Sequence, residues 1–238
     1  VNALDRIDPA ATGDTTTARS GIIADTSAGE WLYKKQLTFL NGTRAEDLKD
    51  FPVLVHLTSS NFDFTKAKND GSDIRFYDAD GTTPLSYEIE SWNASTKQAY
   101  IWVKVPQIDQ SSSSDSIWME YGNPLATDAQ SATNVWNSGF QAVWHMDETS
   151  GTAVGDSTGN GWNGTATSGV QRNSVTKING ADRYPDSASN YTKIKTGKHR
   201  CTINTNLVVG IMECFHSKAC CGNNVDADRR ALEITKKV

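Results

Sequence analysis

The sequence predicts an all-β protein: an antiparallel, jelly-roll-like β-sandwich, followed by a second, partial β unit and an irregular C-terminal tail. Short segments between residues 31 and 122 alternate apolar and polar side chains with the period of two that is typical of half-buried strands. No helical pattern separates these segments, which indicates antiparallel sheets packed face to face. Ser, Thr, Asn, Asp and Gly are abundant, as the many turns of such a sandwich require.

The first predicted strand begins at Trp31, after a leader of small and polar residues, 1–29, that has no periodicity. Its apolar side chains share one parity, which Lys35 interrupts: Trp31, Tyr33, Leu37 and Phe39. The second strand has one clean apolar face, formed by Phe51, Val53, Val55 and Leu57. Pro52 fits near its start because the edge of a strand does not need to donate a hydrogen bond there.

Four further strands complete the predicted sandwich. Ile74 and Phe76 form the inner face of the first of these, which ends in the Asp-Ala-Asp-Gly turn at 78–81. The other three are read from alternating side chains: Tyr87, Ile89 and Ser91 against Glu88, Glu90 and Trp92; Ile101, Val103 and Val105 against Tyr100, Trp102 and Lys104; Ile117, Met119 and Tyr121 against Trp118 and Glu120.

The organisation after this sandwich is less regular. With the leader at 1–29, the sandwich is expected to occupy residues 30–125, and 124–135 indicates a linker or a short helical turn. A partial β unit is expected over 136–195, opening with the strand 141–148 and continuing through a segment dense in turn residues. Strand rhythm fades after about residue 195, so 196–238 is predicted to be an atypical basic, Cys-containing tail. Within it, 201–238 is expected to contribute little to the fold, with a short helix over 226–238.

Charge and cysteine distinguish this tail from the rest of the chain. The whole chain has a net charge of −5, which argues against nucleic acid as a partner, because phosphate binding needs a clustered basic surface. Residues 193–238 nevertheless hold nine Lys and Arg against four Asp and Glu, together with all four cysteines. The cysteine spacing favours disulfides or unstructured thiols over a zinc site. No apolar run approaches the roughly 20 residues that span a bilayer.

Motifs from residue 31 to residue 123 point to a known family. They are Trp31 with Tyr33-Lys34-Lys35, Phe51-Pro-Val-Leu-Val55, Asp73-Ile-Arg-Phe-Tyr77, Tyr87-Glu-Ile-Glu90, Trp102-Val-Lys-Val-Pro106 and Tyr121-Gly-Asn123. Together they resemble a family of bacterial domains of unknown function, the family numbered 2341. The resemblance implies a β-rich domain in a secreted or cell-surface bacterial protein that touches polysaccharide. Residues 143–148 and 156–161 resemble the opening of a laminin-G-like, concanavalin-type jelly roll, which often follows this family.

Four tryptophans are candidates for binding a glycan. Flat exposed aromatic rings stack on sugar faces, while polar side chains bond the hydroxyl groups. Trp92, Trp102 and Trp118 have the parity opposite to the aliphatic positions of their strands, and Trp162 lies in a turn rich in Gly and Asn. The alternative for each is packing in the core, where most tryptophans of a sandwich are found.

Two pairs of carboxylates make glycoside hydrolysis an alternative function, since that reaction uses two carboxyl groups on one accessible face. Glu88 and Glu90 are two residues apart on one strand, so both point the same way at roughly 7 Å. Asp147 and Glu148 are a second pair. The alternative is an ordinary solvated strand face.

Calcium is the one cofactor that the sequence suggests, at Asp78 and Asp80 in an acidic turn. This turn resembles half of an oxygen-rich loop, without the carboxylate that closes an EF-hand. The alternative is turn chemistry, in which each side chain bonds its own backbone.

The sequence therefore favours a non-catalytic carbohydrate-binding or surface-adhesion module of an exported bacterial protein, with polysaccharide or another glycan as its partner. A glycoside hydrolase is the first alternative and a structural spacer the second. There is no phosphate-binding glycine loop of the form Gly-x-x-x-x-Gly-Lys-Ser/Thr.

Overall fold

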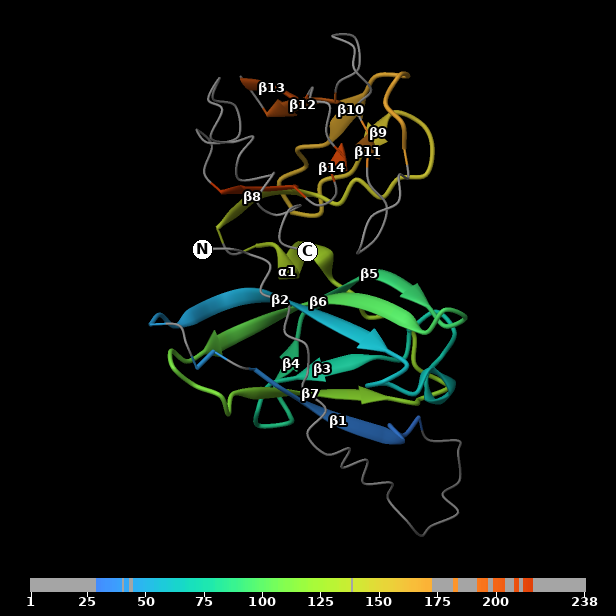
Figure 1. Ribbon diagram of the computed structural model, residues 1–238, viewed down its shortest axis with the longest axis vertical. Coiled ribbons are helices and arrows are strands. Elements are labelled where there is room, and N and C mark those ends of the chain that lie inside the picture. Colours follow the sequence, from blue (N-terminus) through green and yellow to red (C-terminus); the bar gives the residue numbers. More distant parts are fainter. Residues whose placement is uncertain are drawn as a thin grey trace. The chain divides into compact units, whose positions relative to one another are not determined.

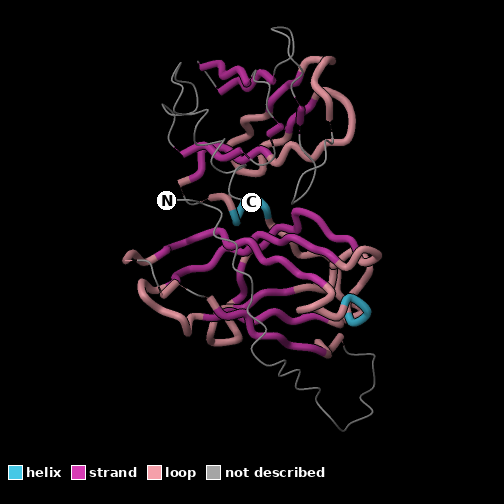
Figure 2. The backbone as a smooth tube through the Cα atoms, viewed as in Figure 1, coloured by secondary structure: helices cyan, strands magenta, loops and turns pink. Residues whose placement is uncertain are grey.

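The computed structural model describes residues 29–39, 41–42, 45–137, 139–172, 182–183, 192–196, 199–203, 208–209 and 212–215. It divides the chain into two compact units, one ending at Ser131 and the other beginning at Ala132. Strands make up most of the regular structure (Figure 2). Every strand pair is antiparallel, which confirms the predicted all-β sandwich class.

The first unit contains seven strands and one short helical turn among its described residues. They are β1 (Tyr33–Thr38), β2 (Leu48–Thr58), the 3-10 helix η2 (Phe64–Lys66), β3 (Arg75–Tyr77), β4 (Pro84–Leu85), β5 (Tyr87–Asn93), β6 (Gln98–Ile108) and β7 (Ser116–Tyr121). The second unit contains α1 (Ala132–Val135), β8 (Phe140–Trp144), β9 (Ala153–Val154), β10 (Gly164–Ala166), β11 (Asp182–Arg183), β12 (Thr192–Thr196), β13 (His199–Ile203), β14 (Val208–Val209) and β15 (Met212–Phe215).

Two sheets form the two layers of the first unit (Figure 1). One has the strand order β2-β6-β5 and the other the order β1-β7-β3-β4. The alternation that the sequence predicted sets which side chains fill the space between them. The largest set of buried apolar residues lies there: Leu37, Phe39, Val53, Val55, Leu57, Ile74, Phe76, Ile101, Val103, Val105, Ile117 and Met119. The predicted inner faces of these strands are thereby confirmed.

Trp31 departs from the predicted pattern. The strand that it was expected to open begins two residues later, at Tyr33, and Trp31 is half-buried and outside the core. Its ring instead lies over the Arg75 guanidinium, with 5.1 Å between Cζ and the ring centroid.

A bulge in β5 overturns the predicted face of Trp92. Up to Ile89 the strand pairs with β6 in simple register, but the register shifts between Ile89 and Ser91, so that Trp92 lies opposite Ala99. One extra residue in a strand reverses the face of every side chain that follows. Trp92 therefore packs on the core side, against the rings of Phe62 and Phe64.

The segment after β7 covers the outer edge of β5. Ser131 donates its backbone N–H to the carbonyl of Tyr87 at 2.9 Å, and the Gln130 side chain accepts from the N–H of Ile89. An uncovered strand edge is a template for aggregation. The end of the first unit thus protects this edge of its own sheet.

Strand pairing in the second unit continues further than expected. The strand rhythm was predicted to fade after about residue 195, yet β12 pairs with β13, and β15 pairs with β8. Short paired strands therefore extend as far as Phe215, beyond the residue at which the strand rhythm was predicted to fade. The expected helix at 226–238 lies outside the described residues, and so do the side chains of the four cysteines.

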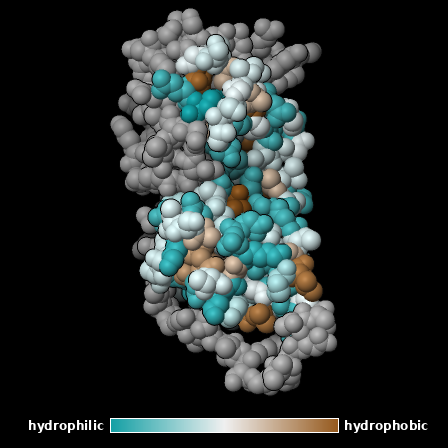
Figure 3. Space-filling model, turned by 90° about the vertical axis from the view of Figure 1, so that its right-hand side faces the viewer, coloured by the Kyte–Doolittle hydropathy of each residue, from teal (hydrophilic) through white to brown (hydrophobic). Residues whose placement is uncertain are grey.

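One side of the described residues carries a largely polar surface. Figure 3 shows one side of the molecule, where hydrophilic side chains predominate and hydrophobic ones form separate patches. Leu32 and Leu125 are the large apolar side chains that are exposed within the described part. No helix in that part combines the length and the apolar character that crossing a membrane requires.

Candidate functional site

The outer face of the β1-β7-β3-β4 sheet carries a cluster of aromatic and polar side chains. The register places Trp118 of β7 between Gln36 of β1 and Tyr77 of β3. Two residues further along β7, and therefore on the same face, Glu120 lies opposite Lys34. Their neighbours on β7, Ile117 and Met119, are fully buried, so these side chains point away from the core. We call the five residues Lys34, Gln36, Tyr77, Trp118 and Glu120 the Trp118 face.

Trp118 is half-buried and held in a fixed position. Its indole Nε1 donates a hydrogen bond to the carbonyl of Ala79 at 3.2 Å, in the turn between β3 and β4. The Lys34 Nζ lies 4.9 Å from the ring centroid, within the range of a cation–π contact. A ring anchored through its nitrogen loses little further freedom when a ligand stacks on it.

Polar groups surround this ring. Lys34 Nζ forms an ion pair with Glu120 Oε1 at 3.1 Å, and its side chain remains 39% exposed. The Gln36 amide donates to the Ser116 hydroxyl at 2.8 Å. Partial burial and, second, the Glu120 charge raise the pKa of the Tyr77 phenol, so Tyr77 stays a neutral donor and acceptor at physiological pH. The face therefore combines one aromatic ring with several hydrogen-bonding groups.

The acidic turn beside this face is occupied by its own hydrogen bonds. Asp80 accepts from the backbone N–H groups of Thr82 and Thr83 and from the Thr83 hydroxyl, and these bonds lower its pKa to about 2. Asp78 accepts from the N–H of Ala79. These contacts are those of the turn-chemistry alternative. Among the described residues, no group of three or more His, Cys, Asp or Glu side chains is placed to hold a metal ion.

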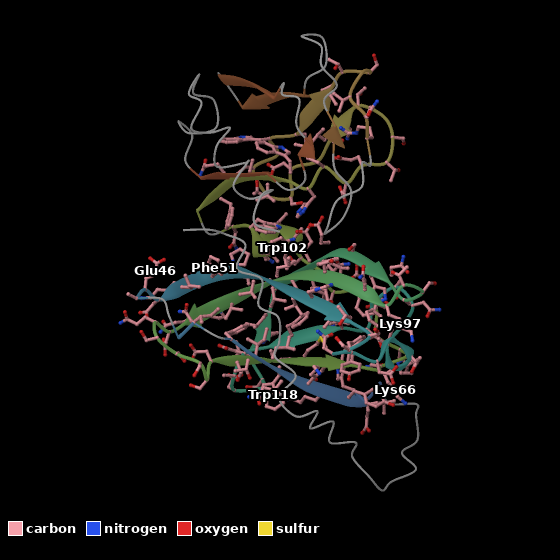
Figure 4. The ribbon with its side chains drawn as sticks, viewed as in Figure 1. Glu46, Phe51, Lys66, Lys97, Trp102 and Trp118 are labelled. Carbon is pink, nitrogen blue, oxygen red and sulfur yellow. The ribbon has the colours of Figure 1, made fainter. Side chains whose placement is uncertain are left out.

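Trp102 lies on the other sheet, with its ring enclosed. It was predicted as an exposed stacking residue, but only 1% of it is exposed. Its Nε1 donates to Glu90 Oε2 at 3.1 Å. Figure 4 shows Trp102 and Trp118 on opposite sides of the sandwich. Trp92 also fails as a surface candidate, because the β5 bulge turns it toward the core. Of the three strand tryptophans, Trp118 is the one whose surroundings suit a ligand.

Trp162 lies in the turn between β9 and β10, half-buried. The Asp156 side chain organises this turn by accepting from the N–H groups of Val143, Thr158 and Trp162. The carbonyl of Trp162 accepts from the Trp144 indole at 2.8 Å. The backbone of Trp162 is therefore fixed, and its ring remains a second candidate for stacking.

The two predicted carboxylate pairs have different surroundings. Glu90 is buried against Trp102, while Glu88, opposite Trp102 on the next strand, is half-buried. Glu148 is paired with Arg172 at 2.8 Å and accepts from the N–H of Gly155, whereas Asp147 is exposed. In each pair, one carboxylate is therefore already bonded within the protein: Glu90 to Trp102, and Glu148 to Arg172 and Gly155.

Asp182 forms a buried ion pair with Arg172 that no sequence pattern predicted. Its Oδ2 lies 2.5 Å from Arg172 Nη1, and none of the residue is exposed. Burial raises the pKa of its carboxyl to about 7, while Arg172 acts in the opposite direction. A carboxyl that is fully enclosed cannot touch a polysaccharide, so we assign Asp182 no part in a binding site.

Sequence reasoning found Trp118 and missed its neighbours. Tyr77 directly follows the buried Phe76, so the same parity rule could have placed it outside. Lys34, Gln36 and Glu120 could not have been found in this way, because cross-strand neighbours depend on the pairing of β1 with β7. Those two strands are about 80 residues apart in the chain.

Comparison with known proteins identifies one family. Residues 70–165 match the model of a domain of unknown function, DUF2341. The predicted resemblance is confirmed over residues 70–123. The match continues through 143–161, where a laminin-G-like jelly roll was expected, and that jelly roll stays a prediction. No curated protein and no solved structure matches the chain.

Proposed function

We propose that the chain is a carbohydrate-binding or surface-adhesion module that uses the Trp118 face to hold a glycan. The observation that carries this proposal is the anchored indole of Trp118 on an outward sheet face, with Gln36, Tyr77 and Glu120 beside it. Sugar rings have one apolar face and a rim of hydroxyl groups. An aromatic ring bordered by donors and acceptors complements both features.

The secreted or cell-surface location of a bacterial protein belongs to the same proposal. It is supported by the resemblance to a family that occurs in exported proteins in contact with polysaccharide. An adhesion module in that setting needs a surface that faces outward and retains its polymer, and it needs no catalytic group. The spacer alternative predicts that no outer face of the sandwich binds a glycan.

A pull-down with insoluble polysaccharides tests the proposal. The full chain is incubated with cellulose, chitin, insoluble mannan and insoluble xylan, and the bound fraction and any released sugar are measured together. Retention without release is expected. Trp118→Ala should weaken binding roughly thirtyfold, since truncation of an aromatic anchor costs about 2 kcal/mol or more.

Two variants make this test specific. Trp162→Ala is the comparison variant, because it removes the second candidate for stacking; if the Trp118 face alone holds the glycan, this variant retains the polysaccharide as the wild type does. Trp118→Phe keeps an aromatic face and should retain part of the affinity. Equal retention by the wild type and Trp118→Ala, both with wild-type melting temperatures, would remove the Trp118 face from consideration. Sugar release that is lost in Glu88→Gln or Glu148→Gln would favour the hydrolase alternative.

A further inference from the structure

Asn-Gly pairs allow a chain to modify itself. Hydroxide removes the proton from the backbone nitrogen of the glycine, and this nitrogen attacks Cγ of the asparagine; glycine offers the attack the least steric resistance. A bond forms between that nitrogen and Cγ, the bond from Cγ to Nδ2 breaks, and Nδ2 leaves as ammonia. Water then opens the cyclic imide to aspartate or isoaspartate. Such pairs lie at 41–42, 160–161, 163–164 and 179–180, the last of them outside the described residues.

The fold protects the pairs at 41–42 and 163–164. Asn41 is only 5% exposed, and its side-chain amide donates to the carbonyls of Asp109 at 2.8 Å and Glu46 at 3.4 Å. Gly164 is buried in β10, which is paired with β9 on one side and β12 on the other, so attack by its nitrogen requires the ladder to open. A local opening that costs about 1.4 kcal/mol already slows a reaction about tenfold.

The pair at 160–161 has the opposite surroundings. Asn160 and Gly161 are both exposed, in the turn between β9 and β10. Gly161 has a φ of +69°, and beyond its chain neighbours no atom lies within 4 Å of the position that a Cβ would take. Its N–H takes part in no hydrogen bond among the described residues. The attacking nitrogen is therefore open to hydroxide, and no strand has to separate before it moves.

The Asn160 side chain attaches this turn to β8. Its Nδ2 donates to the carbonyl of Gln141 at 2.9 Å and, at 3.4 Å, to that of Phe140. The shorter bond is exposed to solvent, so water can replace it when the side chain turns toward Gly161. An ionised carboxylate in place of the amide is an acceptor only and cannot donate to either carbonyl. Deamidation therefore removes both bonds and places a negative charge beside two carbonyl oxygens.

We propose that Asn160 is a site of spontaneous deamidation, which converts it to aspartate or isoaspartate and detaches its turn from β8. Water is the co-reactant, and no enzyme or cofactor takes part. The added negative charge enters the turn in which Asp156 already accepts from the N–H groups of Thr158 and Trp162. Asn160 reacts in this way whether or not the Trp118 face binds a glycan.

Peptide mapping of the folded chain after incubation in mildly alkaline buffer tests the proposal. Mass spectrometry follows the replacement of each side-chain NH2 by OH, fragment spectra separate Asn160 from Asn163, and an isoaspartyl methyltransferase detects isoaspartate. Asn160 should convert at least about tenfold faster than Asn41 or Asn163, and its rate should rise with pH. The same chain unfolded in guanidinium chloride is the control. There the three rates should become similar, because the sequence of each pair is the same and the protection by the fold is lost.

The second half of the proposal has its own measurement. Asn160→Asp supplies the aspartate product without incubation and should lower the melting temperature by at least about 2 °C, since the turn loses its bonds to β8. An unchanged melting temperature would show that the modified turn stays attached. Folded protein in which Asn41 or Asn163 converts as fast as Asn160, or in which Asn160 stays intact while the unfolded chain reacts, would overturn the assignment of the site.

Discussion

Gly122→Ala is expected to destabilise the sandwich by about 2–5 kcal/mol, because Gly122 occupies a conformation and a space that only glycine fits. It follows β7 directly and has a φ of +84°. A Cβ there would lie 2.5 Å from Tyr33 Cδ2 and 3.1 Å from the carbonyl oxygen of Lys66. The Tyr33 ring cannot easily retreat, because it is stacked on Tyr121 with 5.3 Å between centroids.

The stability that Gly122→Ala loses has two parts. Holding an alanine in the left-handed region costs about 1–2 kcal/mol. Forcing an added methyl group into a packed site costs about 1–3 kcal/mol more. Domains of this size have a total free energy of unfolding of about 5–15 kcal/mol, so the variant would lose a large share of it. The melting temperature should fall by at least about 8 °C.

Urea unfolding followed by tryptophan fluorescence measures this loss. Gly42→Ala is the matched control, because no atom lies within 4 Å of its Cβ position and its φ is not positive. That variant should change stability by less than about 0.5 kcal/mol. A Gly122→Ala protein with the control's stability would show that the packing of Tyr33 against the end of β7 is looser than the structure describes. The shift of Tyr33 should also displace the start of β1 and weaken glycan binding.

Three further outcomes are expected. Asp73→Ala should lower the free energy of unfolding by about 1–3 kcal/mol, as measured by urea unfolding. Asp73 is buried and its Oδ2 accepts from the N–H of Gly122 at 3.0 Å, so the substitution leaves that buried N–H without its partner. Trp102→Phe should lower the free energy of unfolding by a similar amount, because the buried Glu90 carboxylate loses its indole donor. If that lost hydrogen bond is the cause, the double variant Trp102→Phe/Glu90→Leu should recover part of the stability. Asp182 has a folded-state pKa raised to about 7 from 3.8, so its contribution to stability is fully present below about pH 4 and is lost as the pH rises to about 7. Asp182→Asn should therefore gain stability relative to the wild type between pH 5 and pH 8, and an unchanged difference would show that the carboxyl is ionised throughout.

Alternation in the sequence was sufficient to locate the core of the first unit. Val53, Val55, Ile101 and Val103 are buried as predicted, because a strand with one face against a partner sheet must place every second side chain there. The pattern fails at Glu90, where one inserted residue reverses the parity of Trp92. An inserted residue leaves no composition signal, since each half of the strand still alternates correctly by itself.

The exposed fraction of a side chain was harder to predict than the side of the sheet to which it points. Trp102 and Trp118 were both expected to point away from the aliphatic face, and both do, yet Trp102 is enclosed and Trp118 is half-buried. Parity gives the side of the sheet and carries no information about what lies over that side. The strands β13 to β15 were missed for a different reason. They are two to five residues long, too short to show a periodicity that differs from chance.

The location of the Trp118 face relative to the family match has a physical consequence. Trp118, Tyr77 and Glu120 lie within residues 70–165, whereas Lys34, Gln36 and Trp31 precede them. Without β1, the edge of β7 would lose its ladder of hydrogen bonds, and the Trp118 ring would lose the cation above it. The matched segment alone therefore contains the stacking residue but not a protected sheet edge. If this face binds glycan, β1 supplies the Lys34 and Gln36 side chains beside the ring, so substitutions in β1 should change the preferred ligand while Trp118 and Tyr77 stay the same.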